Sequence, residues 1–413
     1  MRNSIMTTEN RIAVSPLPAP MPRLMVLLLA AACGLSVANV YYAQPLLDAL
    51  SADFGIGTAA IGGVMTATQV GCALALLLLV PLGDLVNRRH LMLAQLGALT
   101  AALIAVALAT TPLYLLAGML AVGMLGTAMT QGLIAYAATA AAPQERGRVV
   151  GAAQGGVVIG LLLARVMAGI IADLAGWRGV YLFSALLMLL LAVALWRALP
   201  HQARPAQRSS YPAMLLSMLA LLREERTLQI RGVIALLMFA ALNIFWSALV
   251  LPLSAAPYYL SHTAIGAFGL VGVLGVLAAV KAGDWADKGR GQWVSGGALL
   301  LLLAAWLPLG LTPYSLYALT VGIIALDLGA QAIHVANQNM IFNTRPDAHS
   351  RLVGCYMLFY SVGSGLGAMA ATMVYASADW AGVCLLGAAV SLSALVFWGV
   401  TLSRMPVSAP SRS

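Results

Sequence analysis

The chain has 413 residues, of which only 8% are Asp, Glu, Lys or Arg, whereas 62% are apolar or aromatic. Soluble globular proteins carry about 25% charged residues, so this composition excludes a soluble enzyme. The same apolar content excludes a disordered chain. A helix that spans a membrane needs about 20 mostly apolar residues. The sequence therefore indicates a membrane protein that crosses the bilayer many times.

Charged residues and Gly/Pro positions divide the apolar sequence into segments of membrane-spanning length. They predict twelve transmembrane helices, in chain order 24–46, 57–82, 91–109, 113–141, 149–172, 180–199, 229–252, 263–282, 293–311, 314–342, 352–376 and 381–403. The first is predicted to be retained rather than cleaved as a signal peptide, because its apolar run continues past Cys33.

The longest predicted connection divides the twelve helices into two sets of six. We expect a cytoplasmic tail at 1–23, a first bundle at 24–199, a linker at 200–228, a second bundle at 229–403 and a cytoplasmic tail at 404–413. Leucines and methionines between Met214 and Leu222 predict a short helix of the linker that lies on the membrane surface.

The charges of the chain are unevenly distributed. There are 22 Lys and Arg against 13 Asp and Glu, and 20 of the 22 fall on one side of the predicted bundle; Arg165 and Arg178 are the exceptions. Cytoplasmic loops collect Lys and Arg, so we expect both termini in the cytoplasm and the chain in a bacterial inner (cytoplasmic) membrane. The net charge of +9 then indicates orientation rather than binding to nucleic acid.

The sequence has no P-loop, HExxH motif or carboxylate pair, and its four cysteines form no CxxC pair. These features argue against ATP-driven transport, a membrane hydrolase, a metal site and a bound cofactor. The expected partners are a small-molecule substrate, protons and the lipid bilayer, and the protein is expected to be a monomer.

The two predicted bundles contain an internal repeat. A shift of 203 residues superposes identical residues, including the pairs Asp84/Asp287, Gly126/Gly329, Pro143/Pro346, Arg148/Arg351, Gly160/Gly363 and Trp177/Trp380. This constant offset indicates a duplicated six-helix unit. Parallel repeats of this kind occur in transporters whose substrate site lies near the middle of the membrane between the two halves.

Two loop motifs and three shorter stretches resemble a known family. Val80–Arg89 (VPLGDLVNRR) is similar to the loop motif G-x-x-x-D-R-x-G-R-R of the major facilitator superfamily, and Gly283–Arg290 (GDWADKGR) repeats it. Asn39–Leu46, Glu145–Arg148 and Gly160–Arg165 resemble the drug:proton antiporter branch and its YNFM subgroup of exporters. The resemblance implies an all-α membrane fold of twelve helices in two pseudo-symmetric bundles, which transports without being an enzyme.

The charged loop motifs suggest contacts that open and close during transport. We expect the cytoplasmic gating residues to hold neighbouring helices and the two halves together; they are Asp84, Arg88, Arg89, Asp287, Lys288 and Arg290. The alternative is that these charges only set the orientation of the chain in the membrane.

Three ionisable side chains, Arg165, Asp327 and His334, lie in the middle parts of predicted transmembrane helices. Each costs about 2.5–3.5 kcal/mol at the centre of a membrane helix. The repeat places Ala368, Met124 and Gln131 at the corresponding positions. Because residues needed only for the shared fold should recur more often, this asymmetry favours a function for all three.

A polar stripe follows one face of the helix 314–342. Asp327, Gln331, His334 and Gln338 are spaced i, i+4, i+7 and i+11, so we expect them to face a central cavity. Burial penalises the charged form of a carboxylate or an imidazole, so Asp327 and His334 are the candidate proton carriers. The alternative is that the two are hydrogen-bonded to each other or to neighbouring helices.

Further polar residues are candidates for the substrate cavity. Arg165 stands where the antiporter branch has Pro in its glycine motif, and it could bind an anionic substrate, pair with Asp327 or bond backbone carbonyls. The other predicted cavity residues are Asn39, Tyr42, Gln131, Asn243, Trp246, Gln331 and Gln338. Packing between helices is the alternative role for the Asn, Tyr and Trp side chains.

The sequence therefore predicts a proton-coupled secondary transporter that exports a small organic or amphipathic solute by antiport. Import of an organic acid or a sugar by proton symport is the first alternative. A membrane sensor that transports nothing is an alternative of another class.

Overall fold

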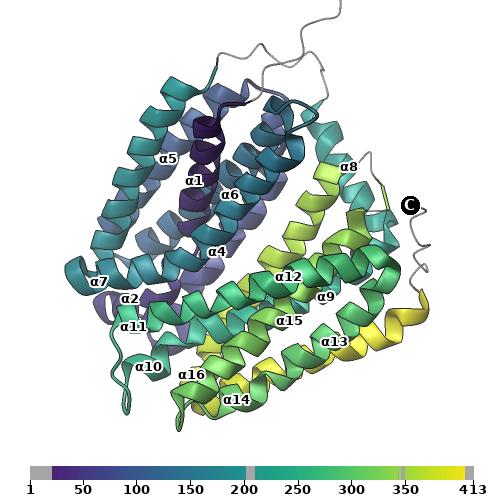
Figure 1. Ribbon diagram of the computed structural model, residues 1–413. Helices are drawn as coiled ribbons and strands as arrows, with labels where there is room; N and C mark the ends of the chain where they lie inside the picture. The colour runs from purple at the N-terminus through teal and green to yellow at the C-terminus, as the bar shows by residue number, and fades with distance from the viewer. Residues whose placement is uncertain (1–20, 201–209, 343, 346–348, 405–413) are drawn as a thin grey trace, which may run out of the picture.

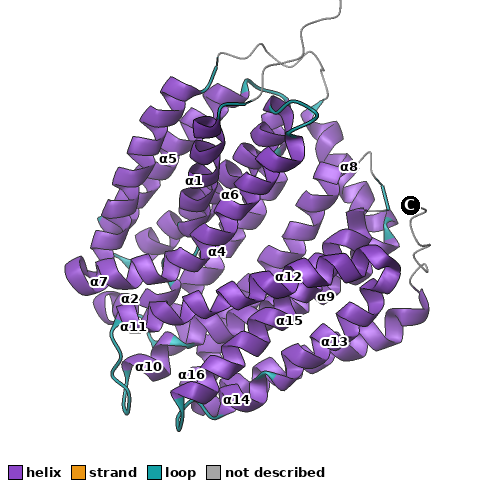
Figure 2. Ribbon diagram, viewed as in Figure 1, coloured by secondary structure: helices purple, strands orange, loops and turns teal. Residues whose placement is uncertain are grey.

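The computed structural model describes residues 21–200, 210–342, 344–345 and 349–404. These residues form helices and connecting loops, and no strand occurs among them (Figure 2). Most of both predicted tails and residues 201–209 of the predicted linker lie outside the described parts.

The first half of the chain forms one bundle of helices (Figure 1). Its elements are α1 (Arg23–Ala38), η1 (Gln44–Leu46), α2 (Leu47–Phe54), α3 (Thr58–Ile61), α4 (Gly63–Leu74), η2 (Ala75–Leu79), η3 (Pro81–Asp84), α5 (Arg88–Ala107), α6 (Pro112–Ala140) and α7 (Arg146–Ala198). Helix α1 is shorter than the predicted segment 24–46, because the chain turns after Ala38 and continues as η1.

The second half begins after the linker helix. Its elements are α8 (Tyr211–Glu224), α9 (Arg226–Ala248), α10 (Val250–Ser254), α11 (His262–Ala267), η4 (Phe268–Gly272), α12 (Val273–Trp285), η5 (Ala286–Arg290), α13 (Gly291–Ala304), α14 (Trp306–Gly310), α15 (Leu316–Phe342), α16 (His349–Thr401) and η7 (Leu402–Arg404). Helix α8 is the predicted linker helix; it buries Met218 and Leu221 against α9 and α16.

Two helices, α7 and α16, are long enough to cross a membrane twice, and each is broken near its middle. The break in α7 is at Gly176 (φ 71°, ψ 173°), and the break in α16 is at Ala378 and Asp379 (φ 51° at Asp379). Gly176 and Asp379 are 203 residues apart, which is the offset of the repeat. Both breaks fall between two predicted transmembrane segments.

The helices account for all twelve predicted segments. Eight described helices are long and apolar enough to cross a membrane, and α7 and α16 each supply two segments. Two shorter apolar helices, Arg23–Ala38 and His262–Gly275, supply the first and the eighth.

Glycine allows the first helix of each half to lie close to its neighbour. A Cβ atom at Gly160 of α7 would overlap the backbone of Gly34 in α1, and one at Gly363 of α16 would overlap the backbone of Leu236 in α9. Small residues permit such close approach between membrane helices. Gly160 and Gly363 are repeat counterparts, so the corresponding helices inside each bundle pack in the same way.

The two halves meet along two contacts that the repeat relates. Helix α11 lies against α7, and α3 and α4 lie against α16. In the first contact Gly266 approaches the backbone of Arg165, and in the second Gly62 approaches the backbone of Ala368. Ala368 is the repeat counterpart of Arg165, so the two contacts are built alike but only the first includes a guanidinium group.

The two ends of the molecule differ in charge. We call the end that carries Arg88, Arg148 and Arg290 the basic face, and the end that carries Asp53 and Asp173 the opposite face. Helices α2, α10 and α11 lie together on the opposite face, at the lower left of Figure 1. The two halves therefore join at that face.

Candidate functional site

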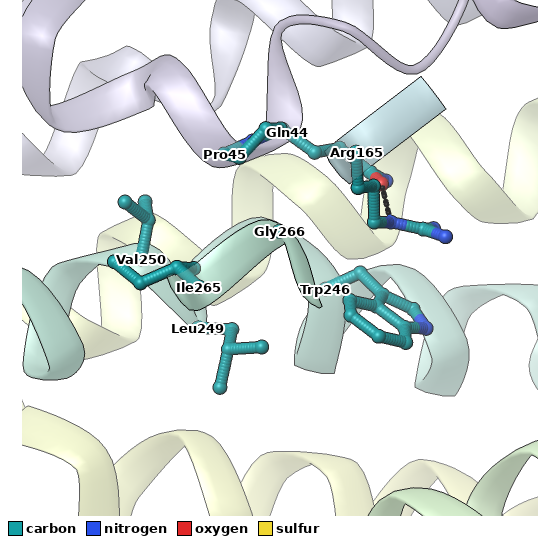
Figure 3. Close-up of a pocket in the computed structure, with 8 residues that line it drawn as sticks. All are labelled: Gln44, Pro45, Arg165, Trp246, Leu249, Val250, Ile265 and Gly266. Carbon is teal, nitrogen blue, oxygen red and sulfur yellow. Dashed lines mark hydrogen bonds between the residues drawn. The ribbon is translucent and has the colours of Figure 1, made fainter. Parts of the chain in front are cut away.

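Arg165 lies at the junction of the two halves, on α7, with 6% of its surface exposed. Its Nε donates a hydrogen bond to Oε1 of Gln44 at 2.9 Å. Its guanidinium carbon lies 4.0 Å from the ring centre of Trp246, which belongs to α9 of the second half, and 5.6 Å from that of Tyr41. Figure 3 shows the guanidinium group extending past Gln44 and beside the indole ring.

The terminal nitrogens of Arg165, Nη1 and Nη2, have no hydrogen-bond or ion-pair partner among the described residues. Neither nitrogen is among the fully buried side-chain atoms that lack a hydrogen bond, so both keep some access to solvent. The small cavity beside the guanidinium, about 10 Å³ in volume, holds one water molecule at most. It is lined by Gln44, Pro45, Arg165, Trp246, Leu249, Val250, Ile265 and Gly266 (Figure 3).

A chain of amides next to Arg165 also joins the halves. Nε2 of Gln44 donates to Oδ1 of Asn243 at 3.2 Å, and Nδ2 of Asn243 donates to Oγ of Ser364 at 2.9 Å. The hydroxyl groups of Tyr41 and Tyr360 are hydrogen-bonded to each other beside this chain. Gln44 thus holds Arg165 with its carbonyl oxygen and the second half with its amide group.

Asp327 reaches the same place from α15 of the second half. It is half-buried, and it interacts electrostatically with Arg165 and through a side-chain hydrogen bond with Trp246. No direct ion pair joins Arg165 and Asp327 in the described parts of the structure. The structure therefore brings together Arg165, Asp327, Trp246 and Asn243 from the predicted set.

Glycines at every third position of α11 and η4 create the room for this group. Gly266 faces the backbone of Arg165, and a Cβ atom at Gly269 would lie 3.3 Å from Cδ of Arg165. A Cβ atom at Gly272 would lie 2.9 Å from Oδ2 of Asp327. This short helix therefore packs against both charged residues, and larger side chains would displace them.

His334 and the predicted glutamines lie elsewhere on the polar stripe. Nδ1 of His334 is hydrogen-bonded to the Tyr356 hydroxyl at 2.9 Å, and its ring packs edge-on to Phe239. Gln331 and Gln338 are half-buried like Gln131, and the described contacts give these three side chains no hydrogen bond. This hydrogen bond to a neighbouring helix matches the second of the two roles that the sequence allowed for His334, the first being that of a proton carrier.

Asn39 and Tyr42 lie apart from Arg165, inside the first half. Asn39 is fully buried; it donates to the carbonyl oxygen of Leu35 at 2.8 Å and accepts from Oγ of Ser184 at 2.6 Å. Tyr42 is buried and also interacts with Ser184. Both side chains therefore connect the end of α1 to the second part of α7.

The described contacts of the predicted gating residues Arg88 and Arg89 lie within the first half. Arg88 donates from Nη1 to the carbonyl oxygen of Ala135 at 3.0 Å, and Arg89 donates from Nη2 to that of Trp196 at 2.7 Å. Lys288 and Arg290 are exposed. The side chains of Asp84 and Asp287 lie outside the described parts of the structure, so the predicted gating role stays a prediction.

A polar junction that the sequence did not reveal joins the halves on the opposite face. Its members, which we call the His262 junction, are His262 and Thr263 of α11, Asp48 of α2 and Asp173 of α7. Nε2 of His262 lies 3.0 Å from Oδ1 of Asp48, and Nδ1 lies 3.2 Å from Oδ1 of Asp173. Asp173 also accepts from the backbone N–H groups of His262 (3.1 Å) and Thr263 (2.8 Å).

The junction depends on both charge and close packing. The hydrogen bond to Asp48, and then the nearby carboxylates, raise the pKa of His262 above its usual value. A Cβ atom at Gly169 of α7 would overlap the backbone carbonyl of His262, so glycine is needed there for α11 to approach. His262 differs from its repeat counterpart Ala59, but it precedes the predicted helix 263–282 and so was not among the ionisable residues inside the membrane.

Another buried arginine is Arg231 of α9, near the start of the predicted helix 229–252. It is fully buried near the basic face, where its Nη1 donates to Oγ of Ser295 (2.8 Å) and Oδ1 of Asn337 (3.3 Å). Its Nη2 donates to Oε1 of Gln292 at 2.7 Å. All these partners lie in the second half, so Arg231 holds α9, α13 and α15 together.

Comparison with known proteins places the chain among transporters. It is 38% identical to the Escherichia coli O157:H7 protein named "Uncharacterized transporter YgaY" over 91% of this chain and 94% of that protein. It is 31% identical to the Streptomyces coelicolor protein named "Probable transporter SCO4007" over 89% of this chain and 85% of that protein.

Solved structures share the fold at low sequence identity. A bacterial homologue of the human lysosomal transporter Spinster matches with a TM-score of 0.78 and 16% identity, over 94% of this chain and 98% of that one. The human organic anion transporter MFSD10 matches with a TM-score of 0.64 and 18% identity, over 92% of this chain and 100% of that one.

The family profile agrees with these matches. The Major Facilitator Superfamily profile matches residues 26–255 and 231–413, which together cover both halves. The predicted all-α membrane fold of twelve helices is confirmed. The protein is therefore a membrane transporter, and the chain belongs to the Major Facilitator Superfamily.

Proposed function

We propose that the protein is a proton-coupled secondary transporter of a small organic solute, with the solute site at Arg165 and Trp246 and the proton carried by Asp327. One observation supports this proposal above the others. A cationic side chain of the first half and an acidic side chain of the second half meet at the junction between the halves. A group that binds there acts on both halves at once, as alternating access requires.

The contacts between the halves describe one of the states that such a transporter visits. The His262 junction, the contact of Gln44 with Asn243 and the contact of Arg165 with Trp246 all cross between the halves on the opposite-face side. We propose that the basic face is cytoplasmic and that this state is closed toward the outside. Opening to the outside breaks these contacts.

The sequence resemblance predicts the direction of transport as export in exchange for protons. A second candidate is symport of an organic acid with protons, and one specific observation favours it. The two terminal nitrogens of Arg165 form a pair of free donors at the junction, which suits an oxyanion.

Transport in proteoliposomes tests the proton assignment. Solutes that stabilise the purified protein against heating are added to vesicles that contain a pH-sensitive dye. The parent protein and the control Asp53→Asn, which removes a carboxylate from the opposite face, should move protons when solute is added. Asp327→Asn should still exchange solute for solute but move no protons. Proton movement at the parent rate in Asp327→Asn would overturn the proposal.

A further inference from the structure

Arg178 is the other arginine that the sequence places away from the basic face, and it forms a charged pair with Asp53 on the opposite face. Its Nη1 lies 2.5 Å from Oδ2 of Asp53, and its Nη2 donates to the carbonyl oxygen of Ala109 at 3.2 Å. Its guanidinium carbon lies 4.3 Å from the ring centre of Trp177, whose indole N–H donates to Oδ2 of Asp53 at 3.1 Å. The side chains of Arg178 and Asp53 are 43% and 39% exposed, so a ligand can reach both charges.

An apolar groove begins beside this charged pair and runs between α5 and α6. Its volume is about 480 Å³, and Ala109 belongs to its lining. The lining is mostly alanine and glycine, and its two large side chains, Leu108 and Tyr114, are each 69% exposed. Along α6 the groove extends from Tyr114 to Ala121, which is about 10 Å of helix. Since α5 packs against α6 and α7 of its own half, this exposed apolar surface faces the lipid.

The internal repeat shows that the fold does not require the charged pair. At the offset of 203 residues, the two charged positions hold Ala256 and Ala381. The tryptophan is retained as Trp380, which donates its indole N–H to the carbonyl oxygen of Leu309 at 2.8 Å instead of to a carboxylate. The first half therefore carries two charges at the membrane surface that its duplicate folds without.

The small residues of the groove differ between the halves in the same way. At the same offset, three of the alanine and glycine residues in the lining correspond to the bulkier Pro308, Val321 and Ile324. Residues needed only for the shared fold should recur more often than these do. The joint loss of the charges and of the small residues from the second half indicates one ligand that uses both.

We propose that the charged pair and the groove bind one phosphatidylethanolamine molecule from the membrane leaflet at the opposite face. The lipid phosphate binds the guanidinium of Arg178, which has five N–H donors and two described hydrogen-bond acceptors. The lipid ammonium donates to Oδ1 of Asp53, which has no hydrogen-bond partner in the described structure. One acyl chain lies in the groove. The site is on the outside of the first half and is independent of the solute site at Arg165.

Charge complementarity selects this headgroup. Arg178 and Asp53 carry one positive and one negative charge, and phosphoethanolamine presents the matching negative and positive groups. Phosphatidylglycerol offers a phosphate but no cation for Asp53, so the carboxylate repels its negative charge. Phosphatidylcholine offers a cation without N–H groups, which cannot donate to Asp53. Because charge-assisted hydrogen bonds are the strong ones, the ethanolamine lipid should be preferred over both.

Native mass spectrometry tests this site on the full-length protein, titrated in detergent with dioleoyl lipids that carry the three headgroups. The lipids share their acyl chains, so differences in affinity report the headgroup. We expect phosphatidylethanolamine to bind at least about tenfold more tightly than the other two, which corresponds to one hydrogen bond to a charged group. Near-equal affinity of the three lipids would overturn the proposal, and so would tightest binding by phosphatidylglycerol.

Variants assign the preference to individual side chains. Arg178→Gln and Asp53→Asn should each abolish the preference for phosphatidylethanolamine. Ala105→Phe, which fills the groove, should weaken the binding of all three lipids alike. Arg148→Gln is the matched control, because it breaks an arginine–carboxylate pair on the basic face, and it should bind the lipids as the parent does.

The melting temperature of each variant shows that it is folded. A preference for phosphatidylethanolamine that survives in Arg178→Gln or in Asp53→Asn contradicts the headgroup contacts. Parent-like lipid affinity in Ala105→Phe contradicts the placement of the acyl chain. Loss of the preference in Arg148→Gln would show that it belongs to surface charge in general, and the assigned site would then be wrong.

Discussion

Two of the buried arginines in the described structure, Arg231 and Arg165, occupy regions of different kind. Arg231 lies inside one half, and its terminal nitrogens donate to three side chains of that half. Arg165 lies between the halves, and its terminal nitrogens have no partner in the described structure. An arginine whose terminal nitrogens are hydrogen-bonded within one bundle fits a structural role, whereas one whose terminal nitrogens have no described partner, between the two bundles, fits binding.

This comparison teaches that the location of a polar contact matters as much as its geometry. Contacts within one half persist through the transport cycle, so their loss should lower stability. Contacts between the halves must form and break, so their loss should change transport or the balance of conformations and leave stability nearly unaltered. The following substitutions test that distinction.

Arg231→Ala should have the largest effect on the folded protein. It removes three hydrogen bonds between membrane helices, which together stabilise the protein by about 2 kcal/mol at about 0.6 kcal/mol each. The melting temperature of the detergent-solubilised protein measures the loss, and Arg165→Gln is the matched comparison. If Arg165→Gln lowers the melting temperature more than Arg231→Ala does, the distinction between the two regions is wrong.

Trp246→Leu should weaken solute binding and leave the fold intact. A desolvated cation–π contact contributes about 1–2 kcal/mol, so we expect about a tenfold loss of affinity. Trp293→Leu is the control, because that indole is exposed and distant from the site. Calorimetric titration and the melting temperature are measured on both variants. Parent-like affinity in Trp246→Leu would remove the indole from the site.

His262→Gln should shift the balance between conformations rather than stability. The raised pKa of His262 means that its charged contacts are fully present below the usual value near 6.5 and are lost as pH rises through the raised value. The closed opposite face should therefore be favoured at acidic pH in the parent, by about 1 kcal/mol. His262→Gln should show no such pH dependence.

Spin labels across the opposite face measure this balance. Thr110→Cys and Tyr314→Cys place labels on exposed positions of the two halves, and all four native cysteines are buried. The distance distribution should contain more of the long component at alkaline pH in the parent. An unchanged distribution between acidic and alkaline pH would count against the junction as a pH-dependent contact.

Gln44→Leu should have the smallest effect. It removes one hydrogen bond to Arg165 and one to Asn243. Each is expected to contribute about 0.6 kcal/mol, so solute affinity should change only about threefold. Gln331→Leu is the comparison on the polar stripe. A loss from Gln44→Leu as large as that from Arg165→Gln would show that the amide itself binds the solute.

The sequence predicted the architecture because the membrane imposes strong rules. Twelve helices could be located from the lengths of the apolar runs, the 203-residue repeat and the positions of glycine. The breaks at Gly176 and Asp379 are also 203 residues apart. Arg165 and Asp327 were singled out because ionisable residues are costly in a membrane. These signals can be read directly from one amino-acid sequence.

The parts that the sequence did not reveal depend on long-range geometry. Because α1 ends at Ala38 and the chain turns, Tyr41 and Gln44 reach Arg165 in the first part of α7, whereas Asn39 and Tyr42 contact Ser184 in its second part. The His262 junction combines residues 89 and 214 positions apart. Arg231 lies beside the linker in sequence, and only the packing of α13 and α15 shows that it is buried.

Gly169 has a practical consequence for capturing a single state of the protein. Any side chain at this position would overlap the backbone of His262 and Thr263 in α11. Gly169→Leu should therefore wedge the opposite face open and hold the carrier in an outward-exposed form. Such an arrested variant is a suitable antigen for raising binders that recognise one conformation and report its abundance in the membrane.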